Sequence, residues 1–462
     1  MGPGLLPFGD VATRELPLSR LLRLSLFQVS VGMAAVLLMG TLNRVMIVEL
    51  GIAAWLVAFM LSLPLVFAPL RALIGYRSDV HRSHLGWRRV PFIWFGTLLQ
   101  FGGLAILPFA LLVMSGDSHG PPVYGKIGAL LAFLLVGAGM HTTQTAGLAL
   151  ATDLARDDLR PRIVALLFVM LLAGMLVSSL VFGWLLDDFS AIRLIKVIQG
   201  AAVASLLLNI CALWKQEARR PAARVERPNT TFREAWETLR KDRRATRLLT
   251  AVALGTSGFA MQDILLEPYG GQVLHLSVGA TTGLTAILAA GMLAAFWVAA
   301  QQLGRGQDPH RLAAYGALTG VFAFAIVTLV GALQSTPWFA AGVALIGFGC
   351  GLFGVGTLTA AMSLARDGNA GIALGAWGAV QATASGVAIA LGGGLRDIVD
   401  GLSAQGVLGT ALNGSATGYQ AVYLVEVGLL FATLVVIGPL ARFAVNDSSS
   451  DEVGFGLADF PR

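Results

Sequence analysis

The chain has 462 residues, of which 56% are hydrophobic and only 13% are charged, and its mean hydropathy is +0.75. A soluble domain needs far less apolar sequence to fill its core, so this composition excludes a soluble protein and indicates an integral membrane protein. The formal net charge of +6 lies mainly in short loops between apolar segments, a pattern that reports membrane topology and gives no indication of nucleic-acid binding.

About twelve apolar segments are each long enough to cross a membrane, for which roughly 20 residues are needed. These predicted spans lie at 24–47, 53–75, 90–115, 126–152, 162–187, 191–214, 247–268, 276–303, 311–333, 337–363, 370–395 and 418–444. The predicted fold class is therefore all-α, an integral membrane protein with about 12 transmembrane helices.

Lysine and arginine residues are concentrated in alternate loops between the spans. They occur before the first span, after the second and fourth spans, and densely after the sixth. Because cytoplasmic loops are the ones enriched in Lys and Arg, we expect both termini to be cytoplasmic. Residues 1–20 lack the basic, apolar and cleavage regions of a signal peptide.

A long polar interruption separates six spans from six. The predicted units are an N-terminal six-helix half (1–214), a cytoplasmic linker that contacts membrane lipid (215–246), a C-terminal six-helix half (247–445) and a cytoplasmic tail (446–462). An internal repeat supports this division, because LVGAGMHTTQTAGLALATDLARD at 135–157 aligns without gaps on LIGFGCGLFGVGTLTAAMSLARD at 345–367. The fourth and tenth spans are thus expected to occupy equivalent places in two parallel halves.

The loop after the second span reads GYRSDVHRSHLGWRR and contains Gly75, Asp79, Gly86, Arg88 and Arg89. It resembles the signature loop of the major facilitator superfamily. In such a loop the glycine allows close helix approach, and the aspartate can cap a helix and pair with arginines on the cytoplasmic side.

A degenerate copy of this loop, GRGQDPHR, follows the eighth span and contains Gly304, Asp308 and Arg311. Its glycine and aspartate keep the spacing of the first loop. The two loops, at matching places in spans divided six and six, predict the major facilitator fold with two six-helix halves.

Polar residues interrupt the first and seventh spans at matching places. The first span holds Asn43 and Arg44, and the seventh holds Gln262, Asp263 and Glu267 within MQDILLEPYGG. A charge inside a membrane usually faces the bundle interior and is paired, so we predict an Arg44–Asp263 ion pair near the periplasmic ends. This polar group is either a gate or ligand contact, or a static brace, or a set of side chains that snorkel to water.

The fourth span contains His141 and Gln144 within a short polar patch. A neutral imidazole can ligate the magnesium of a chlorin, and it can equally donate to a backbone carbonyl in packed protein. We keep His141 and Gln144 as candidate pigment-binding residues.

No catalytic or metal-binding pattern stands out in the sequence. The glycine-rich strings of the tenth and eleventh spans follow no strand and lack a Walker lysine, and neither a nucleophile elbow nor HExxH occurs. Cys211 and Cys350 lack the spacing of a zinc site or a disulfide framework. We therefore expect a protein that is not an enzyme, with no catalytic residues and no metal site.

Five stretches carry a resemblance to a known family: LSLFQVSVGM (24–33), GTLNRVMIVEL (40–50), ALIGYRSDVHRSHLGWRRVPFIWFG (72–96), QTAGLALATDLA (144–155) and MQDILLEPYGGQVL (261–274). They resemble the PucC/LhaA family, the bacteriochlorophyll-delivery branch of the major facilitator superfamily. The resemblance implies an assembly factor of light-harvesting antennae in the bacterial inner, intracytoplasmic photosynthetic membrane. It implies light-harvesting α and β polypeptides as partners and bacteriochlorophyll as the molecule delivered to them, with bacteriochlorophyll-synthesis enzymes as further candidate partners.

Two other functions remain open at this stage. One is secondary transport of a small organic solute, and the other is a pigment-free scaffold for antenna assembly. The sequence suggests that Asp263 and Glu267 are the main carboxyl groups inside the membrane. This scarcity argues against a proton-coupled transport mechanism.

Overall fold

The computed structural model describes residues 16–66, 87–115, 121–156, 159–217, 242–363, 370–409 and 414–443, and the regular structure within them is helical. Most of the predicted linker, all of the predicted tail, and Gly75, Asp79 and Gly86 lie outside the described residues. The elements are α1 (Leu18–Ala35), η3 (Val36–Leu42), η4 (Val45–Glu49), α2 (Ala54–Val66), α4 (Val90–Met114), α5 (Pro122–Leu154), α6 (Arg160–Leu185), α7 (Ala191–Leu213), α9 (Arg243–Ala260), η6 (Met261–Ile264), α10 (Leu266–Gln272), α11 (Val278–Gly304), α12 (Pro309–Leu333), α13 (Thr336–Ser363), α14 (Ala370–Ala404) and α15 (Thr417–Phe443).

Eleven helical segments in the described residues are long and apolar enough to cross a membrane. The remaining predicted span, 53–75, is represented by the shorter apolar helix Ala54–Leu65. The prediction of an all-α protein with about 12 transmembrane helices is confirmed, and the protein is a multi-pass membrane protein.

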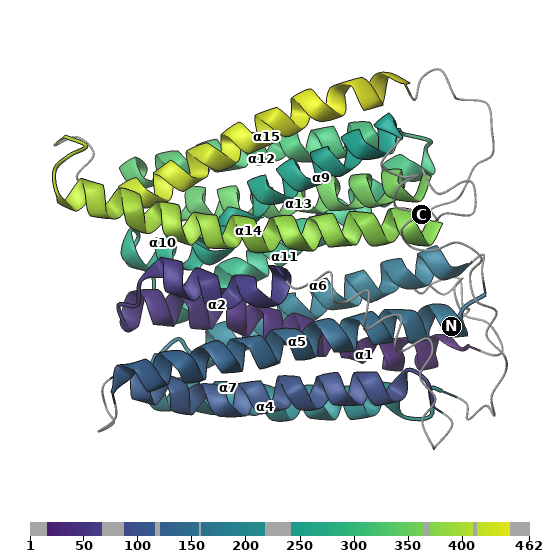
Figure 1. The fold of residues 1–462 in the computed structure, drawn as a ribbon, viewed down its shortest axis with the longest axis horizontal. Coiled ribbons are helices and arrows are strands. Elements are labelled where there is room, and N and C mark those ends of the chain that lie inside the picture. The colour runs from purple at the N-terminus through teal and green to yellow at the C-terminus, as the bar shows by residue number, and fades with distance from the viewer. Residues whose placement is uncertain are drawn as a thin grey trace.

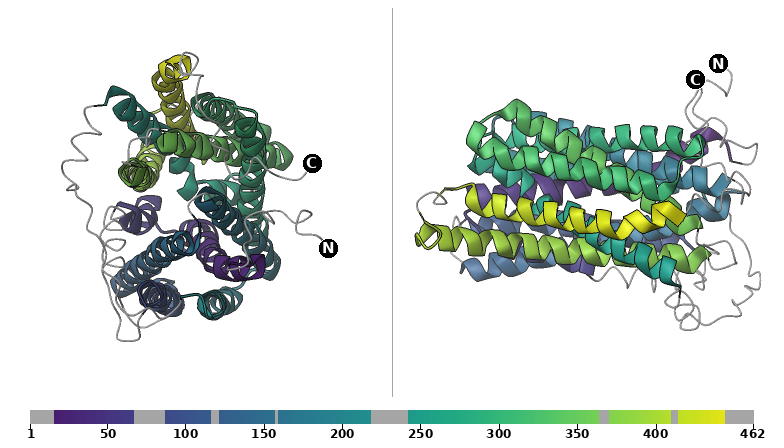
Figure 2. Two further views of the ribbon diagram at one scale, coloured as in Figure 1. Left: turned by 90° about the vertical axis from the view of Figure 1, so that its right-hand side faces the viewer. Right: turned by 90° about the horizontal axis from the view of Figure 1, so that it is seen from above.

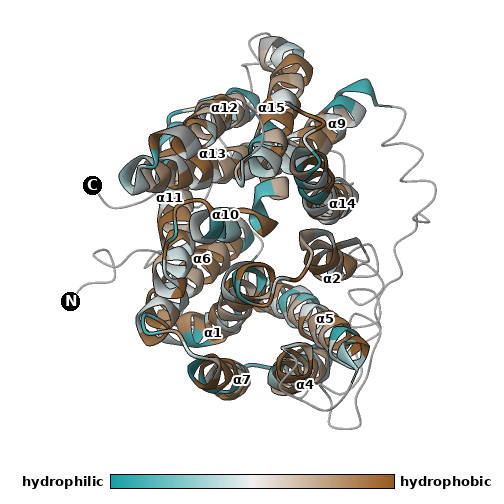
Figure 3. Ribbon diagram, turned by 90° about the vertical axis from the view of Figure 1, so that its left-hand side faces the viewer, coloured by the Kyte–Doolittle hydropathy of each residue, from teal (hydrophilic) through white to brown (hydrophobic). Residues whose placement is uncertain are grey.

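The helices run side by side along the long axis of the molecule, as Figure 1 shows. Helices α1 to α7 form one side of the bundle, and α9 to α15 form the other. The end-on view in Figure 2 shows the same separation. In Figure 3 hydrophobic residues are spread over the helices of both groups, including the outer helices α4 and α7, as expected where a helix faces lipid.

The internal repeat is visible in helix packing. A Cβ atom at Gly139 of α5 would lie 2.5 Å from the carbonyl oxygen of Gly96 on α4. A Cβ at Gly349 of α13, which is aligned with Gly139 in the repeat, would lie 2.8 Å from the carbonyl oxygen of Gly316 on α12. Each pair of glycines allows two membrane helices to approach closely, so equivalent residues have equivalent roles in the two halves.

Exposed tryptophans lie at both ends of the bundle. Trp55, Trp184 and Trp338 lie where α2 begins, α6 ends and α13 begins, whereas Trp94 and Trp214 lie where α4 begins and α7 ends. Tryptophan is enriched at the two membrane interfaces, so these residues mark the edges of the membrane-embedded region.

Candidate functional site

The seventh span is broken, and its sequence explains the break. Helix α9 ends at Ala260, the 3₁₀ turn η6 follows, and α10 begins at Leu266. Pro268 has no N–H group to donate to the carbonyl oxygen of Ile264, which lies four residues earlier, so a continuous α-helix would leave this carbonyl unpaired. The polar residues of MQDILLEP therefore lie at a discontinuity inside the membrane.

Asn43 of the other half supplies the missing donor. Its Nδ2 atom donates to Ile264 O at 2.8 Å, and it lies 3.5 Å from Asp263 O and 3.0 Å from Met39 O on its own span. Asn43 lies between the π-helical segments η3 and η4, and π-type turns are frequent at functional sites. The irregular parts of the first and seventh spans thus meet through one buried amide.

Arg44 has a different partner from the predicted one. Its Nη1 group pairs with the carboxylate of Glu49, and its Nη2 group donates to Leu276 O at 3.1 Å. The predicted Arg44–Asp263 ion pair is wrong, because no such pair forms between these two described residues. The arginine side chain is 5% exposed and that of Glu49 is 38% exposed, so the pair connects a buried cation to the membrane edge.

Glu267 lies at the start of α10 and is buried. Its Oε1 atom accepts a hydrogen bond of 2.6 Å from the hydroxyl of Thr285 on α11. A side chain at Gly40 would overlap this carboxyl group, so the glycine lets η3 pass directly over it. Of the alternatives left open for this polar group, snorkelling to water is wrong for Glu267, which is 2% exposed.

Gln262 connects two carboxyl groups. Its backbone N–H donates to Glu426 Oε1 at 2.7 Å, and its Nε2 group donates to Asp263 Oδ1. Glu426 lies on α15 and is fully buried. Glu426 was not predicted from the sequence, although a lone glutamate inside the apolar run AVYLVEVGLLF was the available signal. We call Asn43, Gln262, Asp263, Glu267 and Glu426 the broken-span cluster.

A second polar cluster, also missed from the sequence, lies near the end of α14. Arg396 pairs with Asp397 at 2.7 Å and with Asp400 at 3.0 Å. It also donates to Gln272 Oε1 at 2.8 Å, and the Tyr419 hydroxyl donates to the same atom at 2.6 Å. These five residues are the Arg396 cluster, which connects α14, α10 and α15.

The Arg396 cluster also reaches the N-terminal half. Asp397 Oδ2 accepts a hydrogen bond of 2.8 Å from the backbone N–H of Trp55, in the first turn of α2. One turn before Asp397, Gly393 lies so close to α2 that a Cβ would be 2.8 Å from Ala54 O. The two halves are therefore joined at this end of the bundle by a helix cap and a close glycine contact.

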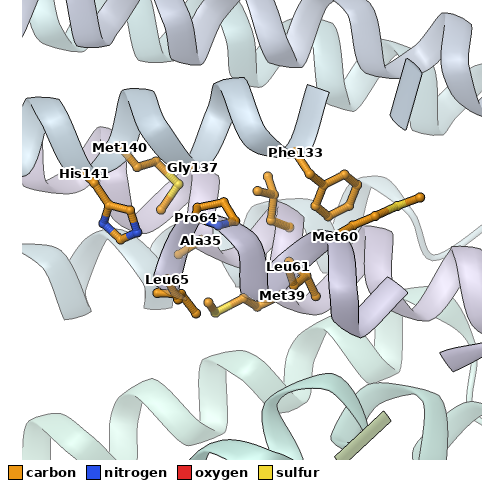
Figure 4. Close-up of a pocket in the computed structure, with 11 residues that line it drawn as sticks. Ala35, Met39, Met60, Leu61, Pro64, Leu65, Phe133, Gly137, Met140 and His141 are labelled. Carbon is orange, nitrogen blue, oxygen red and sulfur yellow. The ribbon is translucent and has the colours of Figure 1, made fainter. Parts of the chain in front are cut away.

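His141 lies near the middle of α5 and lines a small cavity, shown in Figure 4. The cavity measures about 40 Å³ and is otherwise apolar, with Met39, Met60, Phe133 and Met140 among its lining residues. Sites that enclose a drug-sized ligand are of the order of 300–1,000 Å³, so this cavity is too small to enclose a bacteriochlorin.

Gln144 lies one turn after His141 and points to another span. Its side chain donates to Gln28 of α1 at 3.4 Å. The structure thus places both candidate pigment-binding residues on α5, where they face other helices of the N-terminal half.

The described part of the first signature loop is tied to other elements. Arg89 Nε donates to Asp153 Oδ2 of α5 at 3.0 Å. The backbone N–H of Arg88 and that of Val90 donate to the carboxylate of Glu217, at 2.7 and 3.0 Å. Glu217 therefore caps the start of α4, and the beginning of the predicted linker is packed against the N-terminal half.

The second loop acts as a helix cap. Asp308 Oδ1 accepts from the backbone N–H of His310 at 3.2 Å and pairs with its ring nitrogen at 3.0 Å. Gly304 is the last residue of α11, and Arg311 is exposed in the first turn of α12. Asp308 is thus the N-cap of α12, whereas Asp79 of the first loop lies outside the described residues.

The broken-span cluster offers amide and carboxyl groups in a buried setting. Four polar atoms of the cluster are buried and have no hydrogen-bond partner among the described residues: Asn43 Oδ1, Gln262 Oε1, Glu267 Oε2 and Glu426 Oε2. The hydroxyl of the neighbouring Tyr423 is also buried without such a partner. In the same part of the chain, no group of three His, Cys, Asp or Glu side chains is arranged to hold a metal ion. The cluster is suited to binding by hydrogen bonds or charge.

Comparison with known proteins gives a consistent result. The family model described as PUCC protein matches residues 41–445. The chain is 54% identical over 462 residues to a Rhodobacter capsulatus protein described as "Uncharacterized protein in puhA-bchM intergenic region", covering 99% of this chain and 97% of that one. It is 58% identical over 406 residues to protein PucC of Rhodovulum sulfidophilum, covering 86% and 89% of the two chains.

The fold also resembles that of solved transporters. A bacterial homologue of the human lysosomal transporter Spinster, in an inward-facing and unoccupied conformation, matches with a TM-score of 0.67 at 14% identity, covering 94% of this chain and 98% of that one. This likeness concerns the fold alone, and it agrees with the predicted major facilitator architecture.

Proposed function

The chain belongs to the PUCC protein family, and on this premise we propose that it is a membrane assembly factor for bacterial light-harvesting antenna complexes. The observation that carries the proposal is the extent of the match, which runs through nearly all of the chain. In this role the protein hands bacteriochlorophyll to the single-span α and β antenna polypeptides. It works in the inner, photosynthetic membrane with both termini in the cytoplasm, and it catalyses no reaction.

The pigment would be cargo, and the proposal assigns its contact to α5. His141 is the residue that would ligate the magnesium, with Gln144 one turn away. The adjoining cavity is too small to enclose the macrocycle. His141 is only half buried, which leaves part of the residue accessible to a pigment outside the cavity.

The first test is the absorption spectrum and pigment-to-protein ratio of the tagged protein, purified gently from pigment-making cells. Stoichiometric bacteriochlorophyll that survives washing, together with co-purified antenna polypeptides, is the expected result. A colourless protein that still brings down antenna polypeptides would replace pigment delivery with a scaffold function.

The role of His141 is tested by substitution. His141→Leu should lose bound pigment while the protein stays folded, because leucine fills the site but cannot ligate magnesium. His275→Leu is the matched control, since His275 is exposed in the loop after α10 and should leave the pigment content unchanged. Unchanged pigment in His141→Leu would remove this residue from the proposal.

A second candidate function is secondary transport of a small organic solute. The break in the seventh span favours it, because transporter sites are typically built at discontinuous helices. A protein that carries no pigment and no antenna polypeptide, yet changes the separation of spin labels across the two halves when a solute is added, would support transport.

A further inference from the structure

Two carboxyl groups meet at the break in the seventh span without a basic partner. Glu426 and Asp263 are both held by Gln262, and Asp263 is close enough for its charge to act on Glu426. Neither carboxyl group forms an ion pair with a basic side chain in the described part of the chain. Two like charges in this setting repel each other, and a low-dielectric interior strengthens the repulsion.

Several oxygen atoms around this carboxyl pair have no hydrogen-bond partner among the described residues. Glu426 is 0% exposed, and its Oε2 atom has no hydrogen-bond partner among the described residues. The same is true of Gln262 Oε1 and of the Tyr423 hydroxyl, which lies one helical turn before Glu426 on α15. Buried polar atoms are normally hydrogen-bonded, so the two acceptor oxygens of Glu426 and Gln262 indicate a site for a cation or for a hydrogen-bond donor.

The elements around this site carry few charges. Tyr423 contacts the rings of Tyr269 on α10 and Phe324 on α12, and Cys350 of α13 is near Asp263. Arg44, the buried cation of the adjoining first span, is engaged by Glu49 and by the carbonyl oxygen of Leu276. The charge of the two carboxyl groups is therefore not balanced by a side chain.

We propose that a monovalent cation, H⁺ or Na⁺, binds to the oxygens of Glu426, Asp263 and Gln262 and stabilises the broken conformation of the seventh span. The ion supplies the positive charge that the surrounding elements lack. Because Glu426 accepts from the backbone of Gln262 inside η6, a change in its charge acts directly on the turn that contains the break. Discontinuous helices inside the membrane are common sites for coupling cations in transporters.

The site does not depend on pigment handling, so the two proposals fail separately. Cation binding would regulate the conformation of the bundle, whether the cargo is a pigment or a solute. It also weakens the argument that scarce carboxyl groups disfavour proton-coupled transport, because Glu426 is a third carboxyl group inside the membrane, beside Asp263 and Glu267.

The test is hydrogen–deuterium exchange of the peptides that cover residues 259–272 in the purified wild-type protein. One arm raises Na⁺ at constant pH, with N-methylglucamine as the replacement cation. The other arm lowers pH in the absence of Na⁺, with exchange rates corrected for their intrinsic pH dependence. At a cation concentration ten times the dissociation constant, local opening should slow by about tenfold in the arm that supplies the bound ion.

Two variants locate the effect. Glu426→Gln keeps the shape of the side chain and removes its charge, so exchange should no longer respond to the cation. Asp188→Asn is the control, because Asp188 is exposed in the loop before α7 and its change should leave the response intact. An exchange rate in the wild-type protein that responds to neither Na⁺ nor pH would overturn the proposal, whether or not Glu426→Gln folds.

Discussion

The two polar clusters lie near the same end of the bundle and differ in how their carboxyl groups are paired. In the Arg396 cluster, all four carboxylate oxygens of Asp397 and Asp400 accept from a donor, two of them from the guanidinium. In the broken-span cluster, Glu426 Oε2 has no donor in the described structure, and neither Glu426 nor Asp263 has a basic partner. The carboxylate oxygens of the Arg396 cluster are thus all satisfied by described residues, whereas Glu426 Oε2 is left without a donor.

This difference separates two uses of buried charge in one membrane protein. A cluster whose carboxylates are paired with a cation and whose acceptors are filled holds helices together, and changing it should mainly reduce stability. A cluster with unfilled acceptors contributes less to stability and is available to a ligand. Substitutions in the two clusters should therefore have effects of different size and kind.

The largest effect is expected from Arg396→Leu. The change leaves Asp397 and Asp400 without their cation in a partly buried setting, at a cost of up to about 3–5 kcal/mol, the range for fully buried pairs. We expect a marked fall in the thermal unfolding midpoint of the detergent-solubilised protein. Arg193→Leu is the control, because Arg193 pairs with Asp188 in an exposed position and its loss should cost no more than about 1 kcal/mol. Equal loss in both variants would contradict a bracing role for the Arg396 cluster.

Asn43→Leu should have the next largest effect. It removes the donor to Ile264 O and leaves that carbonyl buried and unpaired, at a cost of about 1–3 kcal/mol. The loss should appear as faster deuterium exchange in residues 261–272. Asn209→Leu is a matched control, because Asn209 is also buried but donates to Thr97 within the N-terminal half. Asn209→Leu should reduce stability but should not speed deuterium exchange in residues 261–272.

Periodicity and composition were sufficient to predict the helical spans and the repeat. A span depends on local apolar length, and the aligned glycines Gly139 and Gly349 indeed occupy matching helix contacts. The partner of Arg44 could not be predicted in this way. Internal symmetry places Arg44 and Asp263 in equivalent positions of the two halves, but residues in equivalent positions need not be in contact. Arg44 instead pairs with Glu49, which lies five residues later on the same span.

Pro268 shows what a single sequence can and cannot reveal. Proline has no N–H group to donate within a helix, and the predicted span 247–268 ends at this residue. In the structure the chain instead continues in α10 beyond a 3₁₀ turn, because Asn43 and Thr285 supply donors from other spans. Such compensation depends on tertiary contacts, which local patterns do not contain. Glu426 was missed for the opposite reason, since the apolar pattern around it outweighed one charge.

A double-mutant cycle can measure which acid is coupled to Arg44. With Arg44→Met, Glu49→Gln and the double variant, the coupling energy should be about 0.5–3 kcal/mol, the range for residues in contact. The parallel cycle with Asp263→Asn should be additive within about 0.5 kcal/mol. Coupling to Asp263 that equals or exceeds coupling to Glu49 would restore the ion pair predicted from the sequence.

Glu426→Gln should reduce stability less than the changes at Arg396 and Asn43, measured in the absence of bound cation. The amide oxygen still accepts from the backbone N–H of Gln262, and the substitution removes the repulsion between Glu426 and Asp263. Asp397→Asn makes the same chemical change in the Arg396 cluster and should cost more, because it removes an anion from a matched ion pair. Unfolding midpoints of the two variants, measured side by side, decide between the two uses of buried charge. If Glu426→Gln is as destabilising as Asp397→Asn, the Glu426 carboxylate is a structural group, and the distinction between the clusters fails.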